Sequence, residues 1–170
     1  MDIRLASLDD RNRIMEIIAQ AQEYLKNEGI PQWQNGYPNM ETVVNDINSN
    51  HNYVLVDNNN VIGTCMISFD EDPYYKVIEG NWLSNKPYVV IHRIAIDTTV
   101  KGKGLASHFF KFCECHASKK GVNYIRIDTH ELNTSMQRCI EKNGFQKCGV
   151  VYVMDHAPRI AYEKEISNEI

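Results

Sequence analysis

The sequence lacks any long run of apolar residues. The longest, Val150–Met154, has the length of a strand, whereas a helix that spans a membrane needs about 20 apolar residues. The N-terminus carries charges at Asp2 and Arg4 and has no apolar block of the kind that marks a signal peptide. We therefore expect a protein that is neither inserted into a membrane nor secreted.

The sequence also lacks paired cysteine motifs, which excludes the common cysteine frameworks. The five cysteines are odd in number and form no Cys-x-x-Cys pair, which favours free thiols in a reducing cytoplasm. Cys113, Cys115 and His116 lie close together in the sequence. On a helix, however, Cys113 and Cys115 point about 200° apart and cannot close one metal site. The sequence thus predicts a cytoplasmic protein without a metal.

Positive charge is too sparse for a nucleic-acid-binding surface. The chain has 18 basic and 22 acidic residues and a net charge of −4. Between Val100 and Lys120, however, five lysines and one glutamate give a local charge of +4. This excess favours a small polyanionic ligand, although the last three lysines also suit a solvated helix face. The five are Lys101, Lys103, Lys111, Lys119 and Lys120.

The chain of 170 residues suits one domain with its own hydrophobic core, because domains typically run to about 100–200 residues. At this size about 70% of the surface of the unfolded chain would be buried. We expect a single domain over residues 1–170.

Apolar periodicity and turn residues predict seven strands and four helices. A hairpin is expected at Asp57–Asn60, where four turn-forming residues join two β-rich runs. The strand–helix–strand unit Tyr88–Asp128 must be parallel and right-handed. The fold class is therefore α/β, with a mixed, mostly antiparallel twisted sheet flanked by helices. The expected strands are Ile3–Ala6, Tyr53–Val56, Val61–Phe69, Tyr88–Ile96, Asn123–Asp128, Phe145–Met154 and Arg159–Glu165, and the helices follow Ser7 and Asn39 and span Lys103–Lys119 and Thr134–Asn143.

Capping residues set the expected helix boundaries. Ser7, with Asp10 three residues later, begins the first helix, and Gly29 ends it. Asn39 begins the second. The segment Asp70–Lys86 is predicted to be irregular. The third helix is expected to bury Leu105, Phe109, Phe112 and Cys113.

The segment Tyr88–Ala106 is the most informative, because a strand leads through a glycine-bearing loop into a helix. Helix N-termini have free N–H groups and a positive dipole end, so they bind phosphate well. Gly102 and Gly104 have no side chains to keep a phosphate from the backbone. A P-loop NTPase is excluded, because GxxxxGK[ST] does not occur. The dinucleotide motif GxGxxG/A fits the two glycines but ends in Ser107, and Asp97–Lys101 separates it from the strand.

A third interpretation fits better. Lys101–Ala106 matches the pattern [RQ]-x-x-G-x-[GA], with lysine in the first position, and Ile94-Ala95-Ile96 precedes it. Asn133 opens the segment Asn-Thr-Ser-Met-Gln-Arg-Cys-Ile-Glu-Lys-Asn-Gly-Phe downstream. Together these motifs resemble the acetyl-CoA loop and the following helix of the GNAT superfamily of N-acetyltransferases. The resemblance implies an acyl-CoA N-acyltransferase fold whose fourth and fifth strands splay apart.

The resemblance also implies a cofactor, acetyl-CoA, and the residues that bind it. The pantetheine arm would pair with the backbone of Ile94-Ala95-Ile96, the pyrophosphate would lie on the loop amides, and Asn133 would contribute a side chain. Asn133 also suits the N-cap of the following helix, and both roles can hold. The expected cofactor-binding residues are Ile94, Ala95, Ile96, Lys101, Gly102, Lys103, Gly104, Leu105, Ala106, Ser107 and Asn133.

The implied reaction is transfer of the acetyl group to a primary amine by direct attack in a ternary complex. Such an amine is mostly protonated at neutral pH, so a base must take a proton. His92 is the candidate base, because strand alternation puts it on the face of Ile94 and Ile96. A buried core histidine is the alternative. Family members often have a tyrosine as general acid where this chain has Ile140; Tyr152 and Tyr124 are the possible substitutes.

The acceptor is expected to contact Tyr24 and the aromatic loop Ile30–Asn39, with Trp33 and Tyr37 as walls. Glu71 and Asp72 could attract a cationic amine. The expected partner is a small-molecule or peptide amine, with no nucleic acid and no membrane, and a homodimer stays open. Two other functions remain: a non-catalytic acyl-CoA-binding sensor and a nucleotide-dependent oxidoreductase.

Overall fold

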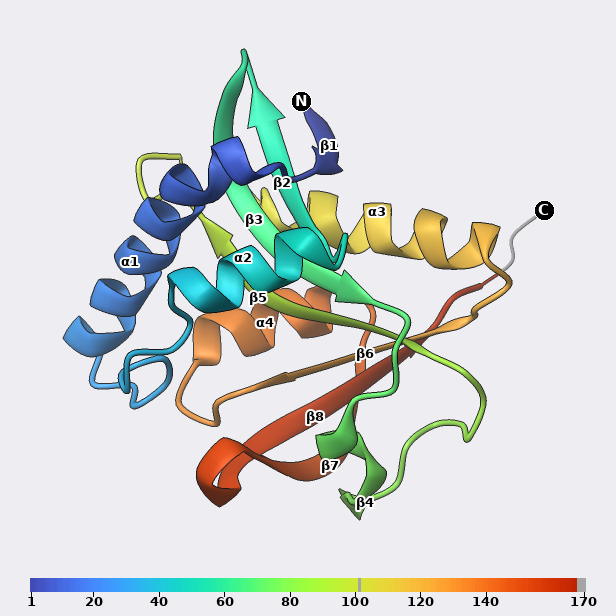
Figure 1. Cartoon of the computed structure of the whole chain (residues 1–170). Coiled ribbons are helices and arrows are strands. Elements are labelled where there is room, and N and C mark those ends of the chain that lie inside the picture. Colours follow the sequence, from blue (N-terminus) through green and yellow to red (C-terminus); the bar gives the residue numbers. More distant parts are fainter. Residues whose placement is uncertain (101, 168–170) are drawn as a thin grey trace. The chain divides into compact units, whose positions relative to one another are not determined.

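Eight strands and four α-helices follow one another along residues 1–100 and 102–167, the part of the chain that this computed structural model describes (Figure 1). Hydrogen bonds order the strands β1-β2-β3-β5-β6-β8-β7-β4. The β5–β6 pair is parallel, whereas β1–β2, β2–β3, β6–β8, β7–β8 and β4–β7 are antiparallel. The predicted α/β class with a mixed, mostly antiparallel sheet is confirmed, with eight strands in place of seven.

Contacts divide the chain into two compact units. Unit 1 comprises Met1–Ile67 and His92–Phe109, and unit 2 comprises Ser68–Ile91 and the chain from Phe110 onward. In no part of the described chain is a helix both long and apolar enough to cross a membrane.

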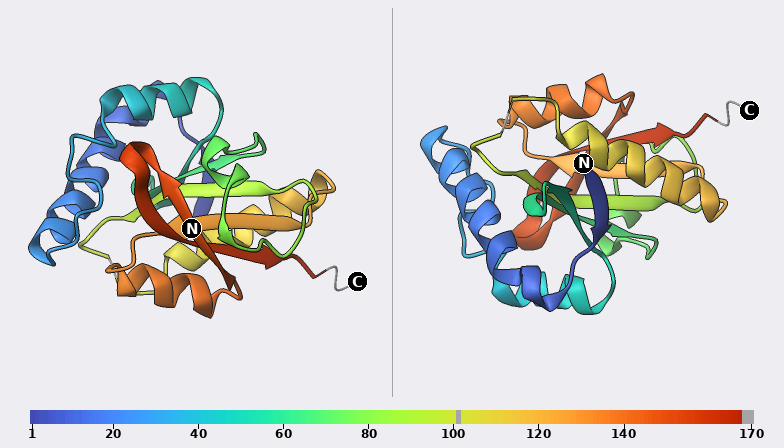
Figure 2. Two further views of the ribbon diagram at one scale, coloured as in Figure 1. Left: turned by 90° about the horizontal axis from the view of Figure 1, so that it is seen from below. Right: turned by 90° about the horizontal axis from the view of Figure 1, so that it is seen from above.

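Unit 1 contains helices α1 and α2, which contact each other and lie at an angle to one another in Figure 2. The predicted cap Asn39 begins α2, where it accepts a hydrogen bond from the Thr42 N–H at 3.0 Å. The predicted pair Ser7 and Asp10 instead caps a short 3-10 helix (Leu8–Asp10) that precedes α1, with the Asp10 carboxylate accepting from the Ser7 N–H at 2.8 Å. The elements of unit 1 are β1 (Asp2–Leu5), α1 (Arg11–Asn27), α2 (Met40–Asn48), β2 (Asn52–Asp57), β3 (Asn60–Ser68) up to Ile67, and the part of β5 (Val89–Ile96) from His92 on.

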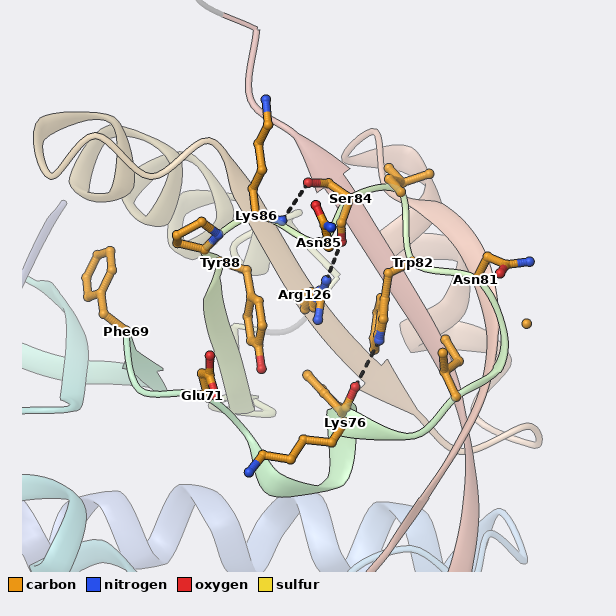
Figure 3. A pocket seen from close by; sticks show the side chains of 15 residues that line it. Phe69, Glu71, Lys76, Asn81, Trp82, Ser84, Asn85, Lys86, Tyr88 and Arg126 are labelled. Carbon is orange, nitrogen blue, oxygen red and sulfur yellow. Dashed lines mark hydrogen bonds between the residues drawn. The ribbon is translucent and has the colours of Figure 1, made fainter.

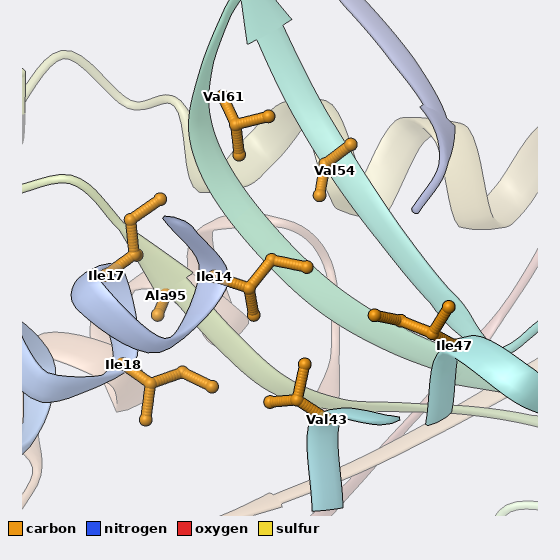
Figure 4. Packing of buried hydrophobic residues seen from close by; sticks show 8 residues of the cluster. All are labelled: Ile14, Ile17, Ile18, Val43, Ile47, Val54, Val61 and Ala95. Atoms are coloured by element: carbon orange, nitrogen blue, oxygen red, sulfur yellow. The ribbon is translucent and has the colours of Figure 1, made fainter. Parts of the chain in front are cut away.

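The core of unit 1 forms where one stripe of α1 and one of α2 meet the strands (Figure 4). Isoleucines three and four residues apart on α1 supply the larger side chains, as helical periodicity requires. Full burial of one such side chain contributes roughly 1.5–3 kcal/mol. The buried cluster consists of Ile14, Ile17, Ile18, Val43, Ile47, Val54, Val61 and Ala95.

Unit 2 has its own core between the sheet and two helices. The rings of Phe110 and Phe145 lie 5.3 Å apart, and Ile125, Ile140 and Val151 are fully buried. The elements are β4 (Glu79–Gly80), the start of β5, α3 (Ala106–Lys119) from Phe110 on, β6 (Tyr124–Thr129), α4 (Thr134–Lys142), β7 (Gln146–Val153) and β8 (Ala157–Glu165).

Strand β4 lies in Asp70–Lys86, where the prediction of wholly irregular structure was wrong. Glu79 and Gly80 pair with Val150 and Gly149 of β7. A Cβ on Gly80 would lie 2.2 Å from the Cys148 carbonyl oxygen, and one on Gly149 would lie 2.0 Å from the Glu79 carbonyl oxygen. Two glycines therefore permit a backbone contact that short-range patterns do not reveal.

Helix α3 begins at Ala106, three residues later than predicted. Gly102 and Gly104 have φ of +91° and +68°, which do not fit a right-handed helix. The prediction that Phe112 faces inward was also wrong. Phe112 is half-buried and stacks on His116 with centroids 5.7 Å apart, while Phe110 is fully buried.

Candidate functional site

The segment that follows β5 and contains Gly102 and Gly104, here called the glycine loop, is bound at its start to α1 of unit 1. Asp97, directly after β5, is buried and accepts hydrogen bonds from the Thr99 N–H and hydroxyl, both at 2.9 Å. Arg13 of α1 donates to the same carboxylate, and Gln20 accepts from the Thr98 N–H at 2.9 Å. The loop therefore leaves β5 in a fixed direction.

The carboxylate of Asp97 is held in its charged form. Burial by itself would raise its pKa, but the Thr99 N–H, the Arg13 guanidinium and the Thr99 hydroxyl outweigh burial, so the pKa lies below its ordinary value. The attachment of the loop to α1 is thus an ion pair as well as a set of hydrogen bonds.

The glycine loop is open on its outer side. Gly102, Lys103 and Gly104 are exposed, and a Cβ built on either glycine meets nothing within 4 Å. The Ser107 N–H donates to the Gly104 carbonyl oxygen at 3.2 Å, which marks the start of α3. The first N–H groups of a helix have no acceptor inside it, and the first turn of α3 contains no acidic residue. The loop can therefore receive an anion.

The β5 residues that precede the glycine loop have side chains that pack against the protein interior. Ile94 and Ala95 are buried, and Figure 4 shows Ala95 directed into the core of unit 1. Ile96 is half-buried, and Leu105 in the loop is buried. A ligand beside this strand would therefore meet mainly backbone groups. Lys101 lies outside the described residues.

His92 and Arg93 stand where β5 departs from regular strand geometry. Arg93 has a φ of +52°, in the left-handed region that non-glycine residues seldom adopt. Strand alternation does not carry across a residue in this conformation, so the predicted face of His92 stays a prediction. His92 is half-buried.

Arg93 belongs to a network that sequence reasoning missed. Its Nε and Nη2 donate to both carboxylate oxygens of Asp46 at 2.7–2.9 Å, and its Nη1 donates to the Tyr37 hydroxyl at 2.7 Å. Asp46 is only 9% exposed. The network joins β5, α2 and the loop Ile30–Asn39. A charged residue inside an otherwise apolar strand was the one signal for it.

The three predicted acceptor residues all belong to unit 1. Trp33 is half-buried, has a φ of +63° and packs against the core. Tyr37 is fixed by Arg93, and Tyr24 is half-buried on α1. Gln22 of α1 also donates to the Pro38 carbonyl oxygen at 3.1 Å. The aromatic loop is thus attached to α1 and β5 by side chains.

In unit 2, Asn133 has the capping role predicted for it, because its Oδ1 accepts from the Met136 N–H at 3.2 Å. Ile140 is 0% exposed and belongs to the core, so this position offers no proton donor. The Tyr152 hydroxyl donates to Glu79 at 3.0 Å, and this hydrogen bond raises the Tyr152 pKa. The Tyr124 hydroxyl donates to Glu165 at 3.3 Å.

A pocket of about 870 Å³ lies in unit 2, where aromatic and charged residues of the segment 69–88 gather beside Arg126 (Figure 3). Glu71, one of the two predicted acidic residues, lines it. Asp72 instead caps a short 3-10 helix (Pro73–Lys76) by accepting from the Tyr74 N–H at 2.9 Å.

The cysteines have the orientation predicted for them. Cys113 is buried, which raises its pKa to about 12, whereas Cys115 is exposed. Over residues 1–100 and 102–167, no three His, Cys, Asp or Glu side chains are grouped to hold a metal ion.

Comparison with known proteins places these features in a family. The family model of the acetyltransferase (GNAT) family matches residues 15–145. An acetyltransferase of the GNAT family from Streptococcus agalactiae 2603 is 31% identical, with 98% of this chain and 96% of that one covered and a TM-score of 0.89. No curated protein matches the chain significantly.

Two more distant structures share the fold. An acetyltransferase of the GNAT family from Listeria monocytogenes 4b F2365 is 20% identical, with 96% and 94% of the two chains covered and a TM-score of 0.75. The Salmonella typhimurium protein yncA, solved with its cofactor acetyl-CoA, is 14% identical, with 100% and 96% covered and a TM-score of 0.70. The chain belongs to the acetyltransferase (GNAT) family, as its loop sequence predicts.

Proposed function

We propose that the chain transfers an acetyl group from acetyl-CoA to a primary amine of a small molecule or peptide, by direct attack in a ternary complex. Membership of the family supports acetyl transfer. The observation that carries the proposal is the glycine loop before α3, which is open on its outer side and lacks an acidic residue in the first helical turn. We also propose that residues 1–170 act as one domain, because the family model runs across both units.

The proposed cofactor site relies on backbone groups. The amides from Gly102 to Ala106 would hold the pyrophosphate, with the Lys103 charge beside it, while the Ser107 N–H donates to the Gly104 carbonyl oxygen. Because the side chains of Ile94 and Ala95 are buried, this strand would offer its N–H and C=O groups to the pantetheine arm. The resemblance adds Lys101 and Asn133. Bound there, acetyl-CoA supplies an acetyl group activated as a thioester.

We assign removal of the amine proton to His92. Histidine exchanges protons readily near neutral pH, and a general base contributes about 10²–10⁴-fold to a rate. His92 directly precedes Arg93, whose bonds to Asp46 fix the backbone at this point of β5. A fixed backbone limits the positions that the imidazole can take.

We propose that no tyrosine protonates the leaving thiolate. Ile140 is enclosed in the core of unit 2, and the hydroxyls of Tyr124 and Tyr152 each donate to a carboxylate. A thiolate is a tolerable leaving group without a proton donor. The aromatic side chains Tyr24, Trp33 and Tyr37 would form the wall for the acceptor.

A non-catalytic acyl-CoA-binding sensor is the second candidate, and the buried Ile140 favours it. Thiol release from acetyl-CoA, measured with a panel of primary amines, separates the two functions. Amine-dependent release that is lost in Gly104→Glu supports the enzyme. Tight binding of acetyl-CoA without amine-dependent release of the thiol at any pH would support the acyl-CoA-binding sensor instead.

A further inference from the structure

The pocket in unit 2 has the size and lining of a small-molecule site. Its volume of about 870 Å³ lies within the usual range of roughly 300–1,000 Å³ for such sites. The rings of Tyr75 and Trp82 lie 5.1 Å apart, and those of Tyr75 and Tyr88 lie 6.3 Å apart. Three aromatic residues thus form one continuous apolar wall.

Arg126 of β6 lies between two of these rings (Figure 3). Its guanidinium carbon is 4.1 Å from the Trp82 ring centroid and 3.9 Å from that of Tyr88. Its Nε donates to Glu163 of β8, and its Nη2 donates to the Ser84 carbonyl oxygen at 2.8 Å. The side chain is 6% exposed, so the guanidinium is held rigidly in a buried position.

Ser84 completes the arrangement, because its N–H donates to Glu163 at 3.2 Å. The ion pair Arg126–Glu163 therefore binds both the N–H and the carbonyl oxygen of Ser84, which lies in the segment 81–88. This fixes the segment that carries Trp82 and Tyr88 over the sheet of unit 2.

One nitrogen of this fixed guanidinium remains for a ligand. Nη1 of Arg126 makes no hydrogen bond to the residues that the structure describes. Within the described residues, Thr129 Oγ1 is the one side-chain polar atom that is both fully enclosed and without a hydrogen-bond partner. Nη1 of Arg126 is therefore not fully enclosed and keeps some exposure. Because Arg126 lines the pocket, we infer that the two N–H groups of Nη1 can donate to a ligand there.

The charges around the pocket favour a single negative charge. Among the lining residues, Arg126, Lys76 and Lys86 carry positive charges and Glu71 carries a negative one. Glu163 pairs with Arg126, the Asp128 carboxylate accepts from the Tyr75 hydroxyl, and the Asp72 N–H donates to the Tyr88 hydroxyl. Lys76 and Lys86 are exposed at the rim and form no ion pair within residues 1–100 and 102–167. The rim lysines and Arg126 attract an anion, and a carboxylate places only one negative charge near these acidic groups, whereas a phosphate dianion would place two.

We propose that this pocket binds a small organic acid, whose carboxylate accepts hydrogen bonds from Nη1 of Arg126 and whose apolar body lies against the aromatic wall. A charge-assisted hydrogen bond from a fixed arginine is stronger than a neutral one and gives the site its selectivity for an acid. The site does not depend on the proposed acetyl transfer.

The test uses the indole signals of the whole protein, labelled with ¹⁵N and free of acetyl-CoA. The chain has two tryptophans, and Trp33→Phe identifies the signal of Trp82, whose Nε1–H donates to the Tyr75 carbonyl oxygen at 3.0 Å. Phenylacetate is the probe, titrated to about 20 mM because a fragment of this size binds weakly. We expect a saturable shift of the Trp82 signal, little change of the Trp33 signal, and about tenfold weaker binding of phenylacetamide.

Variants assign the effect to the pocket. Arg126→Lys keeps the charge and removes Nη1, and should weaken phenylacetate binding about tenfold. If Arg126→Lys unfolds, the double variant Lys76→Gln/Lys86→Gln tests the proposal instead. Both side chains are exposed, so the fold should be kept, and phenylacetate binding should weaken several-fold. Lys147→Gln on β7, also exposed, is the matched control and should bind normally.

Three results would overturn the proposal: no saturable shift of Trp82, equal binding of the amide, or unchanged affinity in a folded variant that lacks the rim lysines. Failure of acetyl-CoA to bind would defeat the proposed function and leave this result untouched. Once an amine acceptor is known, inhibition of acetyl transfer by phenylacetate can be measured. Competition with the amine would mean that the acceptor itself carries the carboxylate that binds Arg126. Non-competitive inhibition would mean that the pocket binds an organic acid other than the acceptor. Both patterns support the site.

Discussion

Arg93 and Asp46 join β5 to α2 by three hydrogen bonds, with Nε–Oδ2 at 2.9 Å, Nη2–Oδ1 at 2.8 Å and Nη2–Oδ2 at 2.7 Å. Both side chains are largely buried. Removal of one partner leaves the other charge buried and uncompensated, which costs more than the pair itself is worth.

Arg93→Met should therefore lower the free energy of unfolding by about 3 kcal/mol, measured with urea. Replacement of both residues, Arg93→Met with Asp46→Leu, should restore part of this loss, since no unpaired charge remains. Strictly additive effects of the two single substitutions would contradict a direct coupling. The Tyr37 hydroxyl also loses its donor, so we expect a higher KM for the acceptor in Arg93→Met at unchanged affinity for CoA.

Gly104→Glu should abolish CoA binding, because it adds bulk and negative charge to the loop that is proposed to hold the pyrophosphate. Gly104 has a φ of +68°, so any side chain there is strained. Gly104→Ala is the matched control for strain without charge and should weaken binding far less. Calorimetric titration with CoA measures both, and full affinity in a folded Gly104→Glu protein would refute the assigned loop.

Replacement of Lys101 and Lys103 by alanine should weaken CoA binding by a few kcal/mol at most, which is up to roughly a hundredfold in Kd at low salt. The difference from the wild type should shrink as salt rises, because exposed charges are screened. Lys111→Ala on α3 provides a control lysine outside the proposed phosphate loop. Wild-type affinity that does not vary with salt would argue against an electrostatic contribution.

His92→Ala should lower kcat at least about tenfold and leave CoA affinity nearly unchanged, because a general base acts on the amine. If the alanine variant keeps the full kcat, His92 is a core residue and another group takes the proton.

A companion variant tests the absence of a tyrosine acid. Ile140→Tyr should not raise kcat greatly, because the native site would already release the thiolate unaided. The larger side chain should also destabilise the fold by about 1–3 kcal/mol, since Ile140 is fully enclosed. A large gain in kcat would show that proton donation limits the native enzyme.

Stability at acid pH should depend on Asp97. A carboxyl group with a lower pKa in the folded than in the unfolded chain stabilises the fold above its unfolded pKa, and this contribution disappears as pH falls through the folded pKa. The ordinary value for this group is 3.8. Asp97→Asn, which keeps an acceptor for Thr99, should thus be less stable than wild type at pH 7 and approach it below about pH 4. Urea unfolding between about pH 2 and 7 measures this, with exposed Asp9→Asn as control; parallel profiles would contradict it.

Features coded by neighbouring residues could be predicted from the sequence. Asn39 and Asn133 cap helices as expected, and Asn58 and Asn59 form the predicted hairpin turn with φ of +48° and +65°. Turn and cap chemistry acts over three or four residues, so one sequence is enough to detect it.

Features that join distant segments could not be predicted. Arg93 meets Asp46 across 47 positions, and Arg126 meets Glu163 across 37. Nothing near either arginine specifies its partner. The glycine loop was recognised from a local sequence pattern, whereas the pocket around Arg126 is formed by long-range packing of a segment with little regular structure.

The two-residue strand β4 has a consequence for association between copies of the chain. It is last in the strand order and covers β7 at Gly149 and Val150. An uncovered edge strand presents a row of N–H and C=O groups on which another molecule's strand can assemble. Here the outermost strand is only two residues long, and its contact with β7 relies on Gly80 and Gly149. We therefore expect these glycines to limit strand pairing between copies at Gly149 and Val150.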